Sequence, residues 1–268
     1  MDPLALVPYA IAAAGGRTDG VDNSQLVAAG LTLLQRSAPL VRALAGRRSA
    51  LLLPPGPAWI VALAASDGRG AVLLAPDQAA REQELAAWNV GAVFTISPLS
   101  EGLPPGTPHV LLDDAPRRAT VVTTDRVQEV DLGSHFALDL VGDTDGPGSP
   151  EECVLFAATG HAASHRQVID AARDAMRSEQ FTPVDRTVST VAPRSLDELA
   201  LGMLAPLLAG GQLRPLTEHS TSALLRAVRD IDATMIVMPA SANEPLATEG
   251  AEHADQLARI KRVVRVSS

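Results

Sequence analysis

The chain has 268 residues, enough to bury a substantial core, and 46% of them are hydrophobic, as in a folded globular protein. Aromatic residues make up only 3%, which predicts a core of Ala, Leu and Val and little stacking surface for bases. The formal net charge of −9 argues against binding of nucleic-acid phosphates, which requires clustered Arg and Lys, so we expect no DNA or RNA partner.

The first segment, residues 4–14, is apolar and predicts a helix. It lacks the positively charged start of a secretion signal, and Gly15-Gly16-Arg17 interrupts it before a membrane span is complete. Cys153 is the only cysteine, which excludes an intrachain disulfide and fits a reducing cytosol; we expect it to be a buried, inert strand residue. These features predict a cytoplasmic protein that does not bind membranes.

Apolar residues at helical spacing over residues 24–45 predict one long second helix. Short apolar runs and helical patterns then alternate as strand, helix, strand, helix and strand, over residues 50–53, 58–65, 70–74, 78–88 and 91–96. Strands separated by helices of this length form right-handed crossovers in a parallel sheet covered on both faces. The predicted fold class is therefore α/β, with a layered, mainly parallel sheet flanked by helices.

A Gly/Asp/Pro-rich stretch, residues 142–150, predicts a linker. Before it lie a loop at residues 97–106 and strand candidates at residues 109–112, 120–124 and 127–132. We therefore expect a first α/β subdomain over residues 1–141 and a second over residues 151–268. In the second, after the segment described next, strand, helix, strand, helix, strand and strand are expected over residues 187–191, 196–208, 212–216, 222–231, 234–239 and 259–268.

Residues 151–168 contain the best candidate for a site. An apolar run at residues 154–157 ends in Thr159-Gly160, and a helical pattern runs from Ser164 to Ser178, which predicts a strand, a tight loop and a helix. Such a junction directs backbone N–H groups and a helix N-terminus at whatever lies above the sheet, and these favour an anion such as phosphate.

The same segment resembles a known phosphate loop. Residues 158–168, Ala-Thr-Gly-His-Ala-Ala-Ser-His-Arg-Gln-Val, align without gaps with the Thr-Ser-Gly-Thr-Thr-Gly-x-Pro-Lys-Gly-Val loop of the adenylate-forming superfamily, which includes acyl-CoA synthetases, nonribosomal-peptide adenylation domains and luciferases. Gly160 and Val168 keep the family residues. The other characteristic positions are substituted: the two threonines by His161 and Ala162, the second glycine by Ala163, the proline by His165 and the lysine by Arg166.

The resemblance extends along the chain in the order of elements. Residues 65–76 and 91–94 are similar to the first strands of the family's N-terminal domain, and residues 192–211 to a segment that begins with a Pro-x-x-His motif, here with Leu196 in place of the histidine. It implies that the strands at residues 50, 71, 92 and 154 share one sheet, and we expect an antiparallel hairpin at residues 154–157 to contradict it. It also implies that the sequence stops just before the family's Gly-Gly-Ala turn.

A complete family member joins a carboxylate to the α-phosphate of ATP and then passes the acyl group to a thiol. The resemblance implies that the adenine-binding, ribose-binding and C-terminal lysine segments would lie beyond Ser268. We therefore expect a truncated, degenerate AMP-binding domain that acts as a non-catalytic binding or scaffolding module in a biosynthetic or acyl-carrier pathway. Two alternatives stay open: half of an acyl- or aminoacyl-adenylate-forming ligase completed by a separate chain, and a small-ligand binding protein that holds a nucleotide or an acyl group.

The expected remnant of the cofactor site consists of Thr159, Gly160, His161, Ser164, His165 and Arg166, with weak binding of ATP or AMP and Mg²⁺ and no assigned catalytic residue. His161 and His165 are four apart and share a possible helical face, but no third ligand is near, so we expect no metal site. No Gly-x-Ser-x-Gly, Walker or dinucleotide fingerprint occurs. Asp197-Glu198 is expected to stabilise a helix start.

The same resemblance also predicts a partner. A family domain that stops at this point should leave a sheet edge and apolar helix faces uncovered. We expect self-association or a protein partner to cover them.

Overall fold

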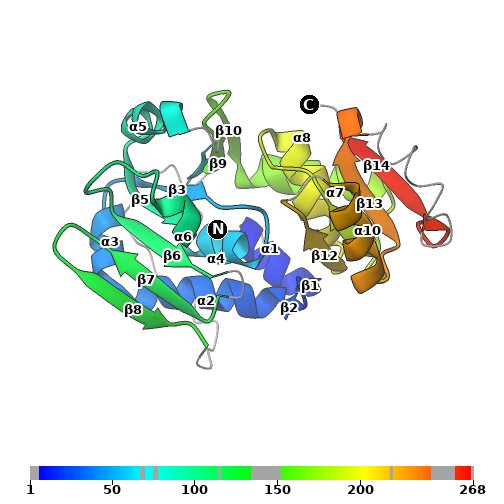
Figure 1. The fold of residues 1–268 in the computed structure, drawn as a ribbon, viewed down its shortest axis with the longest axis horizontal. Coiled ribbons are helices and arrows are strands. Elements are labelled where there is room, and N and C mark those ends of the chain that lie inside the picture. Colours follow the sequence, from blue (N-terminus) through cyan, green and yellow to red (C-terminus); the bar gives the residue numbers. More distant parts are fainter. Residues whose placement is uncertain are drawn as a thin grey trace.

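The computed structural model describes residues 6–66, 70–74, 78–113, 116–133, 152–217, 220–242 and 257–266. Two sheets lie side by side in it, with helices between them and on their outer faces (Figure 1). None of the helices in these ranges is long and apolar enough to cross a membrane.

The first sheet has eight strands in the order β10-β9-β4-β3-β5-β6-β7-β8. The five from β9 to β6 are parallel to one another, whereas β7, β8 and β10 are antiparallel additions at the two edges. The strands at residues 50, 71, 92 and 154 therefore share one parallel sheet, as predicted. Their bounds are β3 (Arg48–Leu52), β4 (Ala71–Leu73), β5 (Val90–Thr95), β6 (His109–Leu112), β7 (Arg118–Val122), β8 (Val127–Asp131), β9 (Glu152–Phe156) and β10 (His161–Ser164).

The connection after β9 differs from the predicted loop. β9 pairs in parallel with β4 on one side and forms an antiparallel hairpin with β10 on the other. Membership of the main sheet and a hairpin are therefore compatible, and the expectation that a hairpin would contradict the resemblance is wrong. The prediction missed β10 because Ala162 and Ala163 carry little strand propensity, whereas pairing with Leu155 and Val154 decides their conformation.

The second sheet has six strands in the order β14-β13-β11-β12-β1-β2, all parallel except for the β1–β2 hairpin. The first two strands are only two residues long and were not predicted. The bounds are β1 (Arg17–Thr18), β2 (Val21–Asp22), β11 (Arg186–Ser189), β12 (Gln212–Pro215), β13 (Met235–Pro239) and β14 (Arg262–Val266).

Strand pairing crosses the predicted subdomain boundary in both directions. β1 and β2, from the first segment, join the second sheet through β12, and β9 and β10, from the second segment, join the first sheet through β4. The linker expected at residues 142–150 lies outside the described residues. Whether residues 1–141 and 151–268 fold as separate units stays a prediction.

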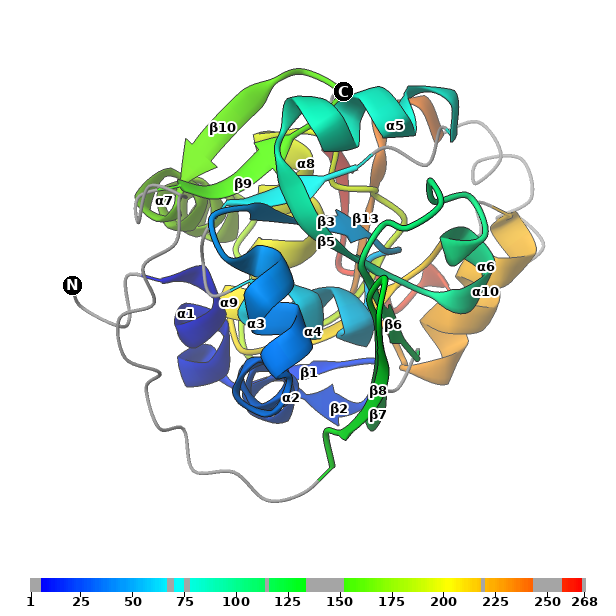
Figure 2. The same cartoon turned by 90° about the vertical axis from the view of Figure 1, so that its left-hand side faces the viewer.

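The helices form three layers. Between the sheets lie α1 (Val7–Ala14), α2 (Asn23–Arg36), α4 (Pro57–Ala65), α7 (His165–Ser178), α8 (Leu196–Leu199), a π-helical turn η2 (Ala200–Leu204) and α9 (Ala205–Leu208). The outer face of the first sheet carries α5 (Gln78–Ala87) and α6 (Ser97–Ser100), opposite α2 and α4, and the outer face of the second carries α10 (Thr221–Asp230) (Figure 2). The short segments α3 (Ala38–Leu44) and η3 (Ala240–Ala242) complete the set.

One continuous hydrophobic core joins the two sheets. It includes Ile11 of α1 and Trp59 of α4, together with Met203 of the π-helical turn and Leu213 of β12. Because cores of this kind are close-packed, the two sheets are held at a fixed separation. The strand ends of the two sheets that face each other above this core therefore have fixed positions.

Two predicted elements have different limits. The helix expected over residues 24–45 is two helices, α2 and α3, because Pro39 has no N–H to continue α2 and the Ser37 side chain instead accepts a bond from the Leu40 N–H at 3.3 Å. The loop expected at residues 97–106 begins with the short helix α6.

Candidate functional site

A cavity of about 420 Å³ opens at the carboxyl ends of the parallel strands. This edge of an open α/β sheet is where ligands characteristically bind. The cavity is built by residues that follow or end β3, β4, β5, β9, β11 and β12, including two from α6, together with one from α4. In chain order they are Leu51, Leu52, Leu53, Pro54, Pro55, Trp59, Leu73, Leu74, Ile96, Pro98, Leu99, Phe156, Ala157, Ala158, Ala192, Pro193, Arg194, Leu216 and Thr217.

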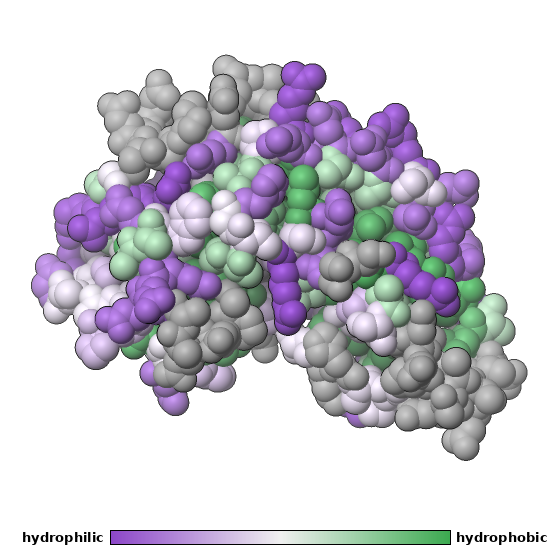
Figure 3. All heavy atoms as spheres, turned by 90° about the horizontal axis from the view of Figure 1, so that it is seen from above, coloured by the Kyte–Doolittle hydropathy of each residue, from purple (hydrophilic) through white to green (hydrophobic). Residues whose placement is uncertain are grey.

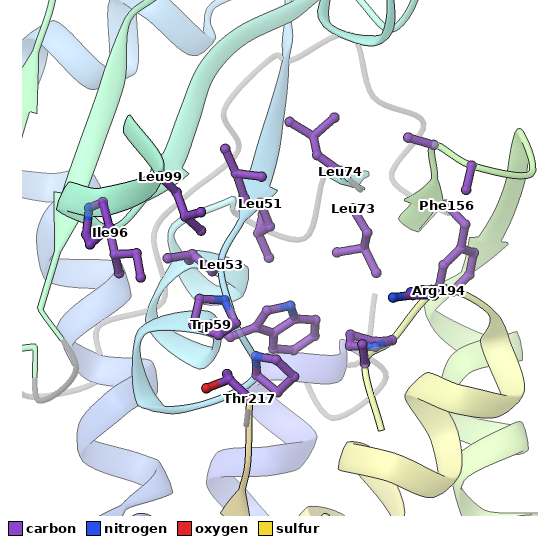
Figure 4. Close-up of a pocket in the computed structure, with 18 of the residues that line it drawn as sticks. Leu51, Leu53, Trp59, Leu73, Leu74, Ile96, Leu99, Phe156, Arg194 and Thr217 are labelled. Atoms are coloured by element: carbon purple, nitrogen blue, oxygen red, sulfur yellow. The ribbon is translucent and has the colours of Figure 1, made fainter. Parts of the chain in front are cut away.

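The lining is almost entirely apolar, and Arg194 is the only charged residue in the part of it that the structure describes. Figure 4 shows Trp59 at the base, with Ile96 and Leu99 on one side and Phe156 and Arg194 on the other. Seen from above, hydrophobic surface lies along the middle of the molecule with hydrophilic surface on either side (Figure 3). The arrangement suits a ligand that is mostly apolar.

The backbone at Arg194 is held in place by the start of α8. Its N–H donates to the Ala192 carbonyl at 3.0 Å and to Glu198 Oε2 at 2.8 Å, and the Ser195 hydroxyl accepts from the Glu198 N–H at 3.3 Å. Glu198 thus stabilises a helix start, as the sequence predicted. Within the described residues, the Arg194 guanidinium makes no hydrogen bond or ion pair.

The expected phosphate-loop residues divide into two groups. Thr159 and Gly160 form the exposed turn of the β9–β10 hairpin, where the Gly160 N–H donates to the Phe156 carbonyl at 2.9 Å and Gly160 has a φ of +68°. His161 begins β10, and its ring stacks on that of Phe156 with 6.4 Å between centroids. These three residues lie together, next to the pocket residue Ala158.

Ser164 begins α7 in a capping box. Its hydroxyl accepts from the Gln167 N–H at 3.2 Å, and its own N–H donates to Gln167 Oε1 at 2.8 Å. The prediction that a helix starts here is confirmed.

His165 and Arg166 lie beyond that cap and have different surroundings. His165 is only 4% exposed, and its Nδ1 accepts a hydrogen bond from the Val7 N–H at 3.1 Å. The Arg166 side chain is 92% exposed and lies 3.6 Å from Asp170, one turn along α7. Whether the six expected residues hold a nucleotide stays a prediction.

The remaining candidate groups do not assemble into a site. No group of three His, Cys, Asp or Glu side chains in the described residues is placed to hold a metal ion, and His161 is exposed whereas His165 is buried. Cys153 is fully buried in β9, and this burial raises the pKa of its thiol far above the ordinary value, so it is an inert core residue as expected. Lys261 is 64% exposed and lies 3.9 Å from Asp185.

No protein-family model and no curated protein sequence matches the chain. Solved structures do. CmiS6 is 18% identical with a TM-score of 0.72, over 99% of this chain and 66% of that one. A nonribosomal peptide synthetase, FmoA3, in an AMPPNP-bound form is 16% identical with a TM-score of 0.68, over 98% and 31%. The amide bond synthetase McbA from Marinactinospora thermotolerans is 18% identical with a TM-score of 0.67, over 97% and 53%.

The chain therefore spans less than two thirds of the length of each of these proteins. At such low identity the similarity shows the fold. Over the aligned part, the chain has the α/β fold of these structures.

Proposed function

We propose that the chain is a non-catalytic binding domain built on the adenylate-forming fold, and that it holds a small, largely apolar molecule in the pocket between the two sheets. The observation that supports this most is the cavity of about 420 Å³ at the carboxyl ends of the strands. Ligand sites in proteins commonly have volumes of roughly 300–1,000 Å³ and mostly apolar walls with few polar groups. This pocket has both properties.

Catalysis on ATP requires positive charge and hydrogen-bond donors arranged around the phosphates. The segment at residues 158–168 fits this requirement poorly. Ala162 and Ala163 contribute no hydroxyl, His165 is engaged by α1, and Arg166 lies on the outer side of α7 beside Asp170. We therefore assign no reaction step to ATP or Mg²⁺ in this chain.

The fluorescence of Nile red, a neutral apolar dye, tests the pocket directly. We expect saturable binding that quenches Trp59, measured in a Trp88→Phe background so that Trp59 is the only tryptophan. Ala157→Phe should fill the cavity and reduce dye binding at least about tenfold, a loss of about 1.4 kcal/mol. Ala86→Phe, on the exposed surface of α5, is the matched control.

Two results would overturn the proposal. One is the absence of saturable dye binding to the folded protein. The other is equal binding by the Ala157→Phe and Ala86→Phe variants, which would place the dye elsewhere on the surface.

A further inference from the structure

We infer that Arg194 selects the ligand of the pocket, so that the pocket accepts an apolar molecule that ends in an anionic group and rejects neutral and cationic analogues. The inference rests on the proposed function, because it concerns the same cavity. It adds the charge of the ligand and the residue that recognises it.

The first support for the inference is the charge of the residues that line the cavity. Nineteen of the described residues line the cavity, and these nineteen include one cation and no acidic residue. Among the described lining residues, the only other side chains that can form hydrogen bonds are the hydroxyl of Thr217 and the indole N–H of Trp59. An anionic group at the Arg194 side of the cavity therefore meets a positive charge with which no carboxylate of these nineteen residues competes, and a cationic group meets repulsion.

The second support for the inference is the hydrogen bond of the neighbouring carboxylate, that of Glu198. Glu198 is the acidic side chain in contact with Arg194, but its Oε2 accepts from the Arg194 backbone N–H at 2.8 Å. Other arginines of the chain have carboxylate partners within 3.0 Å, among them Arg17 with Asp22, Arg48 with Glu152 and Arg186 with Asp232. In the described part of the chain, the Arg194 guanidinium has none and remains available to a ligand.

The geometry of the loop gives Glu198 a separate role. The Glu198 carboxylate and the Ala192 carbonyl share the Arg194 N–H, and Pro193 restricts the backbone between them. The base of the Arg194 side chain is thereby fixed on the side of the cavity where Phe156 lies (Figure 4). Glu198 is a positioning residue that holds Arg194 without contacting the ligand.

The chemistry of the guanidinium sets the ligand class. Arg presents paired N–H donors that match the two oxygens of a carboxylate or a phosphate, whereas the ammonium of Lys matches them only as a point charge. Because Arg194 is exposed at the rim, solvent weakens the attraction, and we expect a preference for the anion of about tenfold rather than a thousandfold.

Displacement of Nile red by four probes with one octyl chain tests the inference: octanoate, octyl phosphate, 1-octanol and octyltrimethylammonium. In the wild-type protein, octanoate or octyl phosphate should bind about tenfold more tightly than 1-octanol, and octyltrimethylammonium most weakly. Arg194→Gln should remove the preference for the anions and leave 1-octanol unchanged. Arg194→Lys should keep part of the preference for the anions.

The Glu198 variants separate positioning from folding. Glu198→Ala should reduce the anion preference without changing 1-octanol binding, and Glu198→Gln, which keeps an acceptor for the Arg194 N–H, should restore it. Comparison of octanoate with octyl phosphate shows which anion the guanidinium prefers.

The outcomes distinguish this inference from the proposed function. If all four probes bind equally, or if Arg194→Gln retains the preference for anions, the inference is wrong while the pocket remains a binding site. If none of the probes displaces the dye from the cavity, the proposed function itself fails, and the inference fails with it.

Discussion

The Nδ1 atom of His165 accepts a hydrogen bond from the backbone N–H of Val7 at 3.1 Å, across 158 residues of sequence. The bond joins the first turn of α7, directly after the hairpin, to the first residue of α1. It satisfies an N–H at a helix start that has no partner within its own helix. A residue of the segment that was expected to form a phosphate loop is therefore part of the packing between two helices.

This role predicts a stability effect for His165. His165→Ala leaves the buried Val7 N–H without its acceptor, and we expect the free energy of unfolding in urea to fall by about 1–3 kcal/mol. His161→Ala, at an exposed position four residues earlier, should change it by less than about 0.5 kcal/mol. Equal losses in the two variants would show that the Val7 bond contributes nothing specific.

At Gly30 in α2 we expect the usual effect of replacing glycine by alanine in a helix to be reversed. Replacing glycine by alanine inside a helix usually stabilises it by about 0.8–1 kcal/mol. At Gly30 the added Cβ would lie 2.6 Å from the Cβ of Ala64 and also collide with the Val61 carbonyl oxygen, so α2 and α4 would have to separate. We expect Gly30→Ala to destabilise the protein by about 1–3 kcal/mol.

A thermal melt measures this effect. The exposed neighbour Gln25 gives the control, since Gln25→Ala should leave the melting temperature nearly unchanged. A higher melting temperature for Gly30→Ala would contradict the close contact between α2 and α4.

Much of the fold was predictable because its signals are local. The apolar runs that became β3, β4, β5 and β9 alternate with helical patterns, and such alternation specifies a parallel sheet. The hairpin strands β1 and β2 carry no such signal: they are two residues long and polar at Arg17, Thr18 and Asp22, and pairing with β12 stabilises them. Pro39 is a local signal for the break between α2 and α3, because proline has no N–H to continue a helix.

The site was less predictable than the fold. The segment at residues 158–168 is contiguous, so its resemblance to a phosphate loop can be read from the sequence alone. The pocket, by contrast, is assembled from six separate strand ends that only the topology brings together. The one local signal at these ends was proline, as in Pro54-Pro55 and Pro193, which marks where a strand stops but not what its neighbours are.

Because of Asp185, we expect the stability of the protein to depend on pH in the acid range. Burial raises the pKa of its carboxyl group, but hydrogen bonds from the Thr182 and Thr234 hydroxyls at 2.6 and 3.0 Å and from the Thr182 N–H at 2.8 Å outweigh this and hold the pKa below its ordinary value. A lowered folded-state pKa contributes stability that is fully present above the unfolded pKa of about 3.9 and is lost as the pH falls through the folded-state pKa.

We therefore expect Asp185→Asn to lower the free energy of unfolding by about 1–3 kcal/mol at neutral pH, with the difference from wild type shrinking below about pH 4. Urea denaturation at a series of pH values measures it. Asp170→Asn, in an exposed ion pair with Arg166, should cost less than about 0.5 kcal/mol. A constant difference for Asp185→Asn down to the lowest pH would contradict this account.

The edge strand β14 predicts association. In the described residues it pairs only with β13, and Val263 is 38% exposed on it. We propose that a second copy or a protein partner covers this edge, since uncovered strand edges readily pair with other chains. Light scattering of the pure protein should give a mass above the monomer, and Val263→Lys should lower it. Val184→Lys, at a 71% exposed loop position, is the control; a strict monomer at high concentration would count against self-association.

We propose that the chain binds ligands without adenylating them. Carboxylate-dependent exchange of pyrophosphate into ATP, measured with Mg²⁺ over a panel of carboxylic acids that includes octanoate, tests it most directly. We expect no exchange above the protein-free rate, and an affinity for Mg-ATP no tighter than the millimolar range, because losing several charge-assisted hydrogen bonds of roughly 1.5–3 kcal/mol each weakens binding by orders of magnitude. Exchange that depends on a carboxylate and is lost in Arg166→Ala would contradict the claim and identify the chain as a divergent ligase.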